Sequence, residues 1–307
     1  MLKKWFALLL SLVAVLCFAA CGSKNTGENQ TNTEEASKVK VSVTFNAMKE
    51  FAEAVGGDKV EISTIIPDGT EPHDYEPTAQ DLVGLSAAQV FIYNGFGMEA
   101  WADDAIAAAN NSNLIAVEAS SGATPITNTD EAEIEEHGQY DPHIWLSLKG
   151  AEIEVKNIKD ALVEADPSNK DYYETNCSNF VSQLESLYNE YVDKFASLQK
   201  KNIVTGHAAF AYLCQDFGLV QNSVEDVFAE GEPSAQQLTE LVNYCKENNV
   251  TTIFAEEMAS PEVSQTLADE VGATVKTIYT IESAEDELSY LERMQSNLSE
   301  IYESLSK

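Results

Sequence analysis

Short apolar runs rich in β-branched residues recur along most of the chain, separated by longer stretches with helical periodicity. Four runs precede residue 120, at 39–45, 61–66, 89–94 and 114–119. Four more follow residue 200, at 202–207, 219–224, 251–256 and 274–279. Runs of this kind are typical of buried strands, and the stretches between them, such as 46–55, 97–109 and about 147–165, are typical of helices. The pattern predicts two α/β lobes, each with a central, mostly parallel sheet flanked by helices.

The longest periodic segment lies between the two series of strands. Its apolar side chains recur at intervals of three and four residues: Tyr173, Cys177, Phe180, Leu184, Leu187, Tyr191, Phe195 and Leu198. One helix over about 169–200 would carry this stripe on a single face and would span roughly 45 Å, the scale of a small domain. We therefore expect an N-terminal lobe at 39–167, a rigid linking helix at 168–200 and a C-terminal lobe at 201–307.

The first twenty residues have the pattern of an export signal. Two lysines precede an apolar run at 5–16, which leads to "CFAAC" at 17–21. The run is short for a membrane span, and "AACG" reads as a lipobox in which Cys21 becomes the lipidated first residue of the mature protein. The alternative is an ordinary cleaved signal with an incidental cysteine, since Phe18 stands where a lipobox more often has Leu.

The segment after Cys21, "GSKNTGENQTNTEEASK", is polar and has no hydrophobic pattern. Such a composition is typical of a flexible linker. We therefore predict a lipoprotein signal peptide at 1–20 and a flexible tether at 21–38. The protein is then expected on the extracytoplasmic face of the cell membrane, held there by its lipid anchor.

Charge and cysteine content narrow the class of protein. The chain has 51 acidic residues against 18 Lys and Arg, a formal net charge of −33 at pH 7. The electrostatic potential of so negative a protein argues against nucleic-acid binding and weakly favours a cationic solute. Cys177, Cys214 and Cys245 follow Cys21, too few for a disulfide framework, although one pair among them is open. We interpret all three as small core residues.

The chain has four histidines, His73, His137, His143 and His207. Three of them lie beyond the carboxyl ends of predicted strands: His73 follows the second run, His143 follows the loop after the fourth, and His207 ends the fifth. Open α/β sheets bind ligands at such positions. Taken alone, each histidine is better explained by solvation or packing than by a role as a ligand. Their common location favours a single site between the two lobes.

Five motifs carry a resemblance that covers nearly all of the chain after the tether. They are "EPHDYEPTAQD" at 71–81, "DPHIWLS" at 141–147, "GHAAFAYL" at 206–213, "EPSAQQLTEL" at 232–241 and "IFAEEMASP" at 253–261. In order and approximate spacing, they resemble the solute-binding proteins of zinc and manganese ABC importers, the ZnuA-like family. The resemblance implies two α/β lobes joined by a rigid long helix, with a metal in the cleft between them.

The resemblance also implies a ligand set. The family's ligands fall on His73, His143 and His207, and the fourth falls on Glu282 in "IYTIESAEDELSYL". Imidazoles with one carboxylate suit tetrahedral Zn(II), whereas Mn(II) is expected to use more oxygen donors. Manganese members tend to have a carboxylate at the position of His207. The resemblance thus implies a zinc receptor that delivers Zn(II) to an ABC importer permease, with a manganese receptor as the alternative.

Several residues near these motifs keep two interpretations. The acidic loop at 127–141 stands where zinc members often have a His-rich loop, and we interpret it as a solvated mobile loop rather than a collector of metal. Glu256 either orients an imidazole or is the polar end of a buried strand. Four aromatic residues are expected to pack around the cleft: Tyr75, Trp145, Phe210 and Tyr212.

Two other classes of protein are open to the same residues. A zinc hydrolase would need water in place of Glu282, with Glu256 as the base. A four-ligand set that closes the tetrahedron argues against it, as does the absence of H-E-x-x-H and G-x-S-x-G motifs. A surface adhesin on the same fold is the third class. We expect a monomeric zinc receptor that is not an enzyme.

Overall fold

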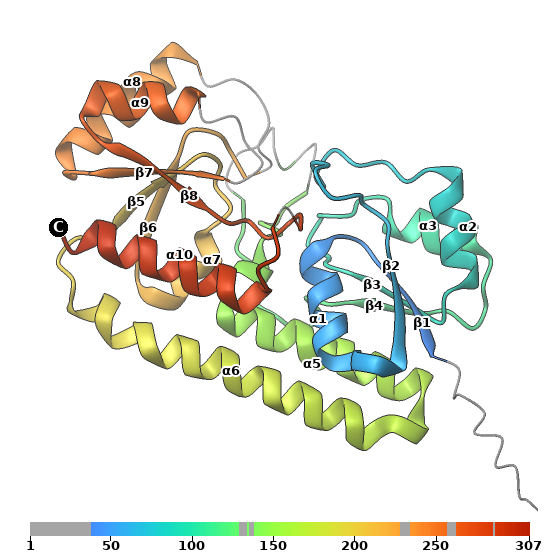
Figure 1. Cartoon of the computed structure of the whole chain (residues 1–307). Helices are drawn as coiled ribbons and strands as arrows, with labels where there is room; N and C mark the ends of the chain where they lie inside the picture. The colour runs from blue at the N-terminus through green and yellow to red at the C-terminus, as the bar shows by residue number, and fades with distance from the viewer. Residues whose placement is uncertain (1–37, 129–133, 135–137, 228–233, 257–261, 285) are drawn as a thin grey trace, which may run out of the picture. The chain divides into compact units, whose positions relative to one another are not determined.

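The computed structural model describes residues 38–128, 134, 138–227, 234–256, 262–284 and 286–307 (Figure 1). The expected signal peptide and Cys21 lie outside the described residues, as does the expected tether apart from Lys38. His137 also lies outside them, with most of the acidic loop.

The first half of the chain forms a parallel four-stranded sheet. Its strand order is β2-β1-β3-β4, with bounds β1 (Val39–Val43), β2 (Val60–Thr64), β3 (Val90–Tyr93) and β4 (Ile115–Glu118). Its connecting helices are α1 (Asn46–Gly56), α2 (Ala79–Ala87) and α3 (Ala102–Ala109), with a 3-10 turn η1 (Gly57–Lys59). The central strands β1 and β3 are almost wholly buried. Strands buried on both faces read as continuous apolar runs, as "VFIY" of β3 does. In β1, "VKVSV", the buried valines alternate with Lys40 and Ser42.

The second half repeats this arrangement. Its sheet is also parallel, in the order β6-β5-β7-β8, with bounds β5 (Asn202–Thr205), β6 (Val220–Ser223), β7 (Thr252–Glu256) and β8 (Thr274–Ile278). The helices that connect its strands are α7 (Ala211–Phe217), α8 (Ala235–Glu247) and α9 (Glu262–Val271). The predicted fold class, two α/β lobes with parallel sheets, is confirmed.

The strands end within one or two residues of the predicted bounds, and in β5 the difference changes the local structure of a histidine. The run at 202–207 was expected to be strand throughout, but β5 stops at Thr205. The Thr205 hydroxyl donates to the carbonyl of His207 (2.6 Å), and the Gly206 carbonyl accepts from Val224 and Glu225 (2.9 and 2.7 Å). These bonds close a turn, so His207 lies two residues beyond the strand.

Three longer helices complete the fold. They are α5 (Leu148–Ala165), α6 (Lys170–Ser197) and α10 (Tyr290–Leu305), and two further 3-10 turns are η2 (Ile144–Leu146) and η3 (Pro167–Asn169). The 28-residue α6 packs against α1, α5, α7 and α10 and runs along the helices of both halves (Figure 1). Its buried side chains belong to the predicted stripe: Tyr173, Cys177, Leu184, Leu187, Tyr191 and Phe195. The prediction of one long helix is therefore confirmed.

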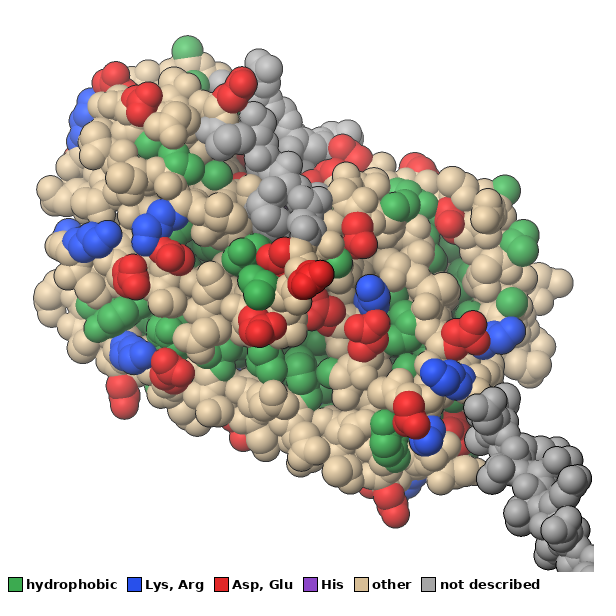
Figure 2. Space-filling view, viewed as in Figure 1, with side chains coloured by type: hydrophobic (Ala, Val, Ile, Leu, Met, Phe, Trp, Pro, Cys, Tyr) green, Lys and Arg blue, Asp and Glu red, His purple; other side chains and the backbone are tan. Residues whose placement is uncertain are grey.

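The main apolar core is shared by both halves. It includes Val41 and Phe91 of the first sheet, Phe254 of the second, and the buried face of α6. Cys177, Cys214 and Cys245 are buried and free, so the interpretation of these thiols as core residues is confirmed. Within the described residues, no helix combines the length and the apolar character needed to cross a membrane. Asp and Glu side chains are spread over the face seen in Figure 2 rather than gathered in one patch.

Candidate metal site

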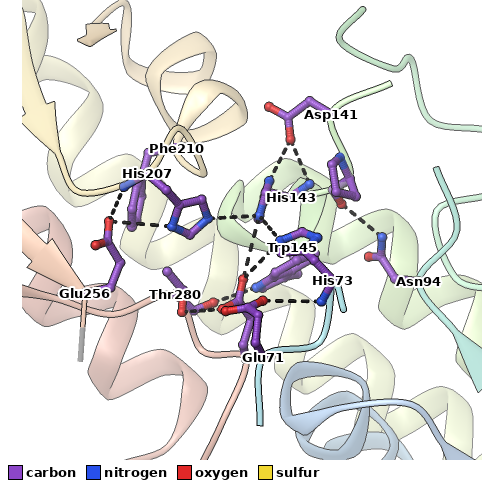
Figure 3. A network of polar contacts seen from close by, with 12 residues as sticks. Glu71, His73, Asn94, Asp141, His143, Trp145, His207, Phe210, Glu256 and Thr280 are labelled. Atoms are coloured by element: carbon purple, nitrogen blue, oxygen red, sulfur yellow. Dashed lines mark hydrogen bonds and ion pairs between the residues drawn. The ribbon is translucent and has the colours of Figure 1, made fainter. Parts of the chain in front are cut away.

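Four side chains that could bind a metal converge from both halves of the fold. His73 lies between β2 and α2, His143 directly before η2, His207 after β5, and Glu282 between β8 and α10. One potential ligand atom from each lies within 4.8 Å of all the others. The three imidazoles point toward one another (Figure 3).

The distances between these atoms suit a tetrahedral ion. The Nε2 atom of His143 lies 3.1 Å from Nε2 of His73 and 3.3 Å from Nε2 of His207. Glu282 Oε1 lies 3.7 Å from the same nitrogen of His143 and 4.0 Å from Nε2 of His73. Atoms bound at about 2.0–2.1 Å to a tetrahedral zinc lie about 3.3–3.4 Å apart. A small cation could therefore be held with little movement of the side chains.

His143 is oriented by the carboxylate of Asp141. One oxygen of Asp141 accepts from the backbone N–H of His143 (2.9 Å) and lies 2.9 Å from its Nδ1. Because a carboxylate only accepts, Nδ1 carries the proton and Nε2 keeps its lone pair for a metal. The Tyr212 hydroxyl donates to the Asp141 carbonyl (2.7 Å), and Asn94 donates to the carbonyl of Pro142 (2.9 Å). The "DPH" segment is thus fixed from both halves of the chain.

His207 is buried beside the carboxylate of Glu256. Glu256 Oε1 accepts from the backbone N–H of His207 (3.1 Å) and lies 3.8 Å from its Nδ1 (Figure 3). A Cβ added at Gly206 would come within 1.9 Å of the Glu256 carboxylate, so only glycine allows this approach. Of the two interpretations of Glu256, the structure supports a partner of His207 at the end of a buried strand.

The protonation state of His207 suits metal binding. Burial holds the pKa of this imidazole well below its usual value, and the neighbouring His143 lowers that pKa further. His207 is therefore neutral at pH 7, the state in which imidazole binds a metal.

Hydrogen bonds fix the turn that carries His73. Its backbone N–H donates to Glu71 Oε1 (3.3 Å), and the Tyr75 N–H donates to the carbonyl of Pro72 (3.4 Å). The Tyr75 hydroxyl donates to Asp81 (2.8 Å), which also caps α2. Tyr75 packs against the core as expected, and its hydroxyl ties the loop to the start of α2. Burial raises the pKa of the Glu71 carboxyl above its ordinary value.

Glu282 presents one carboxylate oxygen to the histidines. The Thr280 hydroxyl donates to Glu282 Oε2 (2.9 Å), and Oε1 is the oxygen that faces His143 and His73. Trp145 is fully buried and its indole N–H donates to the Thr280 carbonyl (2.7 Å). Trp145 therefore packs as expected, and it also fixes the segment that carries Glu282.

Three further residues bond to members of this group and were not predicted from the sequence. Glu71, Asp141 and Thr280 each precede a member by two positions; Glu71 accepts from the backbone N–H of His73, and the other two bond to the side chains of His143 and Glu282. A polar residue two positions before each ligand candidate is a sequence signal that could have identified them.

The role of Asp141 leads to the first prediction. Asp141→Asn is expected to weaken zinc binding by about tenfold or more, because a neutral amide leaves the His143 imidazole less basic and less firmly oriented. Competition against a chelator of known affinity measures the change. Equal affinity of the variant and the wild type would show that Asp141 has no influence on the site.

The fold consists of two α/β units, each with a parallel sheet, and four metal-binding side chains meet where the units join. This combination is the architecture of a metal-binding solute receptor. The chain matches the family described as zinc-uptake complex component A, periplasmic (ZnuA), over residues 41–304. The chain belongs to this family, which confirms the resemblance. Its members are solute-binding receptors and not enzymes.

Individual relatives match along almost their whole length. A Treponema pallidum (strain Nichols) protein is 43% identical over 305 residues, covering 97% of this chain and 96% of the relative. The high-affinity zinc uptake system protein ZnuA of Bacillus subtilis (strain 168) is 36% identical over 318 residues, covering 99% of both chains. A crystal structure of a ZnuA deletion mutant with zinc bound has a TM-score of 0.77 at 31% identity, covering 88% of this chain and 99% of that one.

Proposed function

We propose that this protein binds one Zn(II) through Nε2 of His73, His143 and His207 and Oε1 of Glu282, and delivers it to the permease of an ABC importer. The convergence of these four atoms within 4.8 Å carries the proposal. Three neutral nitrogens and one carboxylate oxygen suit the borderline-soft zinc ion. A ligand set that fills the tetrahedron favours reversible capture of the ion over catalysis by a bound water.

Zinc is proposed over manganese for two reasons. Manganese is expected to use more oxygen ligands than this group offers. The Bacillus subtilis relative is named as a zinc uptake protein, and a solved family structure contains zinc. The family's description as a zinc-uptake component supports the proposal of delivery to a permease.

We also propose how the chain is organised around this function. Residues 1–20 would be the signal peptide, lipidated Cys21 would begin a tether that ends at residue 38, and the receptor would be monomeric. The lobes at 39–167 and 201–307 would be joined by the linking helix at 168–200. Because both lobes would contribute ligands, a movement of one lobe relative to the other would separate the ligands and release the ion.

Metal titration of the purified mature protein tests the proposal. One zinc per chain is expected, and manganese at equal concentration should fail to displace it. Equal affinities for the two ions would favour the manganese receptor. For delivery, a deletion strain should grow poorly under zinc limitation, and normal growth of that strain would favour an adhesin.

A pH dependence follows from the imidazole ligands. Protons compete with zinc for imidazole, whose unperturbed pKa is about 6.5, so affinity should fall as the pH drops from 7.5 to 5.5. Because burial and His143 lower the pKa of His207, that ring is neutral before zinc arrives. No more than two imidazole protons per zinc should therefore be released even at pH 5.5, as calorimetry in buffers of different ionisation enthalpy would measure. An affinity that is flat over this range would mean that histidines are not the main ligands.

A further inference from the structure

The segment that carries Glu282 contains a backbone conformation that its residue type disfavours. Ile281, directly before Glu282, has φ of 61° and is fully buried. This is the left-handed region, where a β-branched residue is an outlier. Such a conformation persists only where the surrounding structure holds it, and it is often found at functional sites.

Helix α10 holds the start of this segment through Asn297. The Asn297 side chain donates to the carbonyl of Tyr279 (2.8 Å) and accepts from the N–H of the same residue (2.8 Å). Asn297 is buried, with 1% of its surface exposed. One amide therefore fixes both backbone groups of Tyr279, just where β8 has ended.

One turn earlier on α10, Arg293 holds the end of the segment. It is the only arginine of the chain and is 1% exposed. Its Nη2 and Nε donate to Asp286 Oδ1 (2.6 and 3.0 Å), and Nη2 also donates to the Asp286 carbonyl (3.3 Å). Residues four apart share a helix face, so Arg293 and Asn297 hold the segment from the same side.

Arg293 also ties this segment to the first half of the chain. Its Nη1 donates to Glu50 Oε1 (2.7 Å) on α1. The Glu50 carboxylate accepts from the backbone N–H of Tyr290 and from the side chain of Asn46 (2.8 Å). The backbone N–H of Asn46 in turn donates to the Glu282 carbonyl (3.3 Å). A planar guanidinium can serve two carboxylates in this way, which a lysine ammonium cannot match.

We propose that Arg293 and Asn297 are positioning residues that hold the strained turn at Ile281, so that the Glu282 carboxylate stays within reach of the three histidines. By this means they set the rate at which a bound metal leaves. The inference rests on the proposed function, because it assumes that Glu282 is a ligand. The hydrogen bonds of Arg293 go to Asp286 and Glu50 rather than to the side chains of the proposed ligands. Arg293 therefore acts on the segment after Glu282, and Asn297 acts on the segment before it.

The test measures zinc release from the mature protein after mixing with excess chelator. Arg293→Lys keeps the positive charge but loses the planar guanidinium that bonds to Glu50 and Asp286 at the same time. This change is expected to speed zinc release about tenfold. The same change in a Glu282→Gln background should add nothing, because the group that Arg293 positions is already lost. Asn297→Ala provides a second variant with the same expected pattern. Lys276→Gln is the matched control. It breaks the partly buried ion pairs of β8 with Glu300 and Glu303 on α10, which among the described residues bond to no part of the segment around Glu282, and it should leave the rate unchanged.

The possible outcomes distinguish the assignment of Glu282 as a ligand from the positioning role of Arg293 and Asn297. If Glu282→Gln alone leaves release unchanged, both the ligand assignment and this inference are overturned. A second outcome is that Glu282→Gln speeds release, and that Arg293→Lys and Asn297→Ala speed it by the same factor in the wild-type and the Glu282→Gln backgrounds. Only the inference is then overturned, because α10 would affect zinc release without acting through Glu282. Absence of any effect of Arg293→Lys and Asn297→Ala in the wild-type background would overturn it as well.

Discussion

His207→Ala is expected to lower zinc affinity at least about tenfold, since losing a ligand should cost no less than losing a partner that orients one. The variant keeps the backbone N–H that donates to Glu256, so the turn after β5 should survive the change. Zinc would be left with two imidazoles and one carboxylate, and water would have to fill the fourth position. Competition with a chelator of known affinity measures the loss.

His137→Ala is the matched control for this experiment. It removes the one histidine that is not among the four proposed ligands, and zinc affinity at the site should be unchanged. Unaltered stoichiometry and affinity in His207→Ala would contradict the ligand assignment. A loss of equal size in both variants would mean that the acidic loop at 127–141 takes part in binding.

Cys21→Ala is expected to release the protein from the membrane fraction. The anchor proposed here is the lipid attached to Cys21, which Ala cannot carry. A single acyl chain binds membranes only marginally, so stable retention depends on the several chains that lipidation at Cys21 is expected to supply. Cell fractionation followed by immunoblotting measures the shift.

Zinc binding should not change in the same variant, because all four proposed ligands lie in the compact unit that follows residue 36. A Cys21→Ala protein that stays membrane-bound after signal cleavage would contradict the lipobox interpretation. A released protein that no longer binds zinc would contradict the separation of tether and receptor.

The order of strands and helices could be predicted because short apolar runs alternate with stretches of helical periodicity. The central strands β3 and β7, which hold Val90 and Ile253, are buried and read as apolar runs, the pattern of a parallel sheet covered by helices. The spatial order of the strands could not be predicted, since β1 pairs with both β2 and β3 through contacts that leave no local pattern. Strand ends were less certain, as the turn after Thr205 shows.

The candidate ligands came from position and resemblance together. His73, His143 and His207 could be grouped because each follows a strand, whereas Glu282 was identified through the resemblance alone. The partners of these side chains are harder to read from sequence. Asp141 and Glu256 are two of the 51 acidic residues of the chain. The position of Asp141 two residues before His143 is a signal for it, but the contacts with His143 and His207 are established by the structure.

X-ray absorption at the zinc edge, on the mature protein loaded with one equivalent of zinc, would identify the ligands of the ion. We expect a four-coordinate ion with three imidazole nitrogens and one carboxylate oxygen, at about 2.0–2.2 Å. The Glu282→Gln variant should keep the imidazole signal and alter the oxygen contribution. A shell of six oxygen atoms, or an ion bound by fewer than three imidazoles in the wild-type protein, would contradict the account.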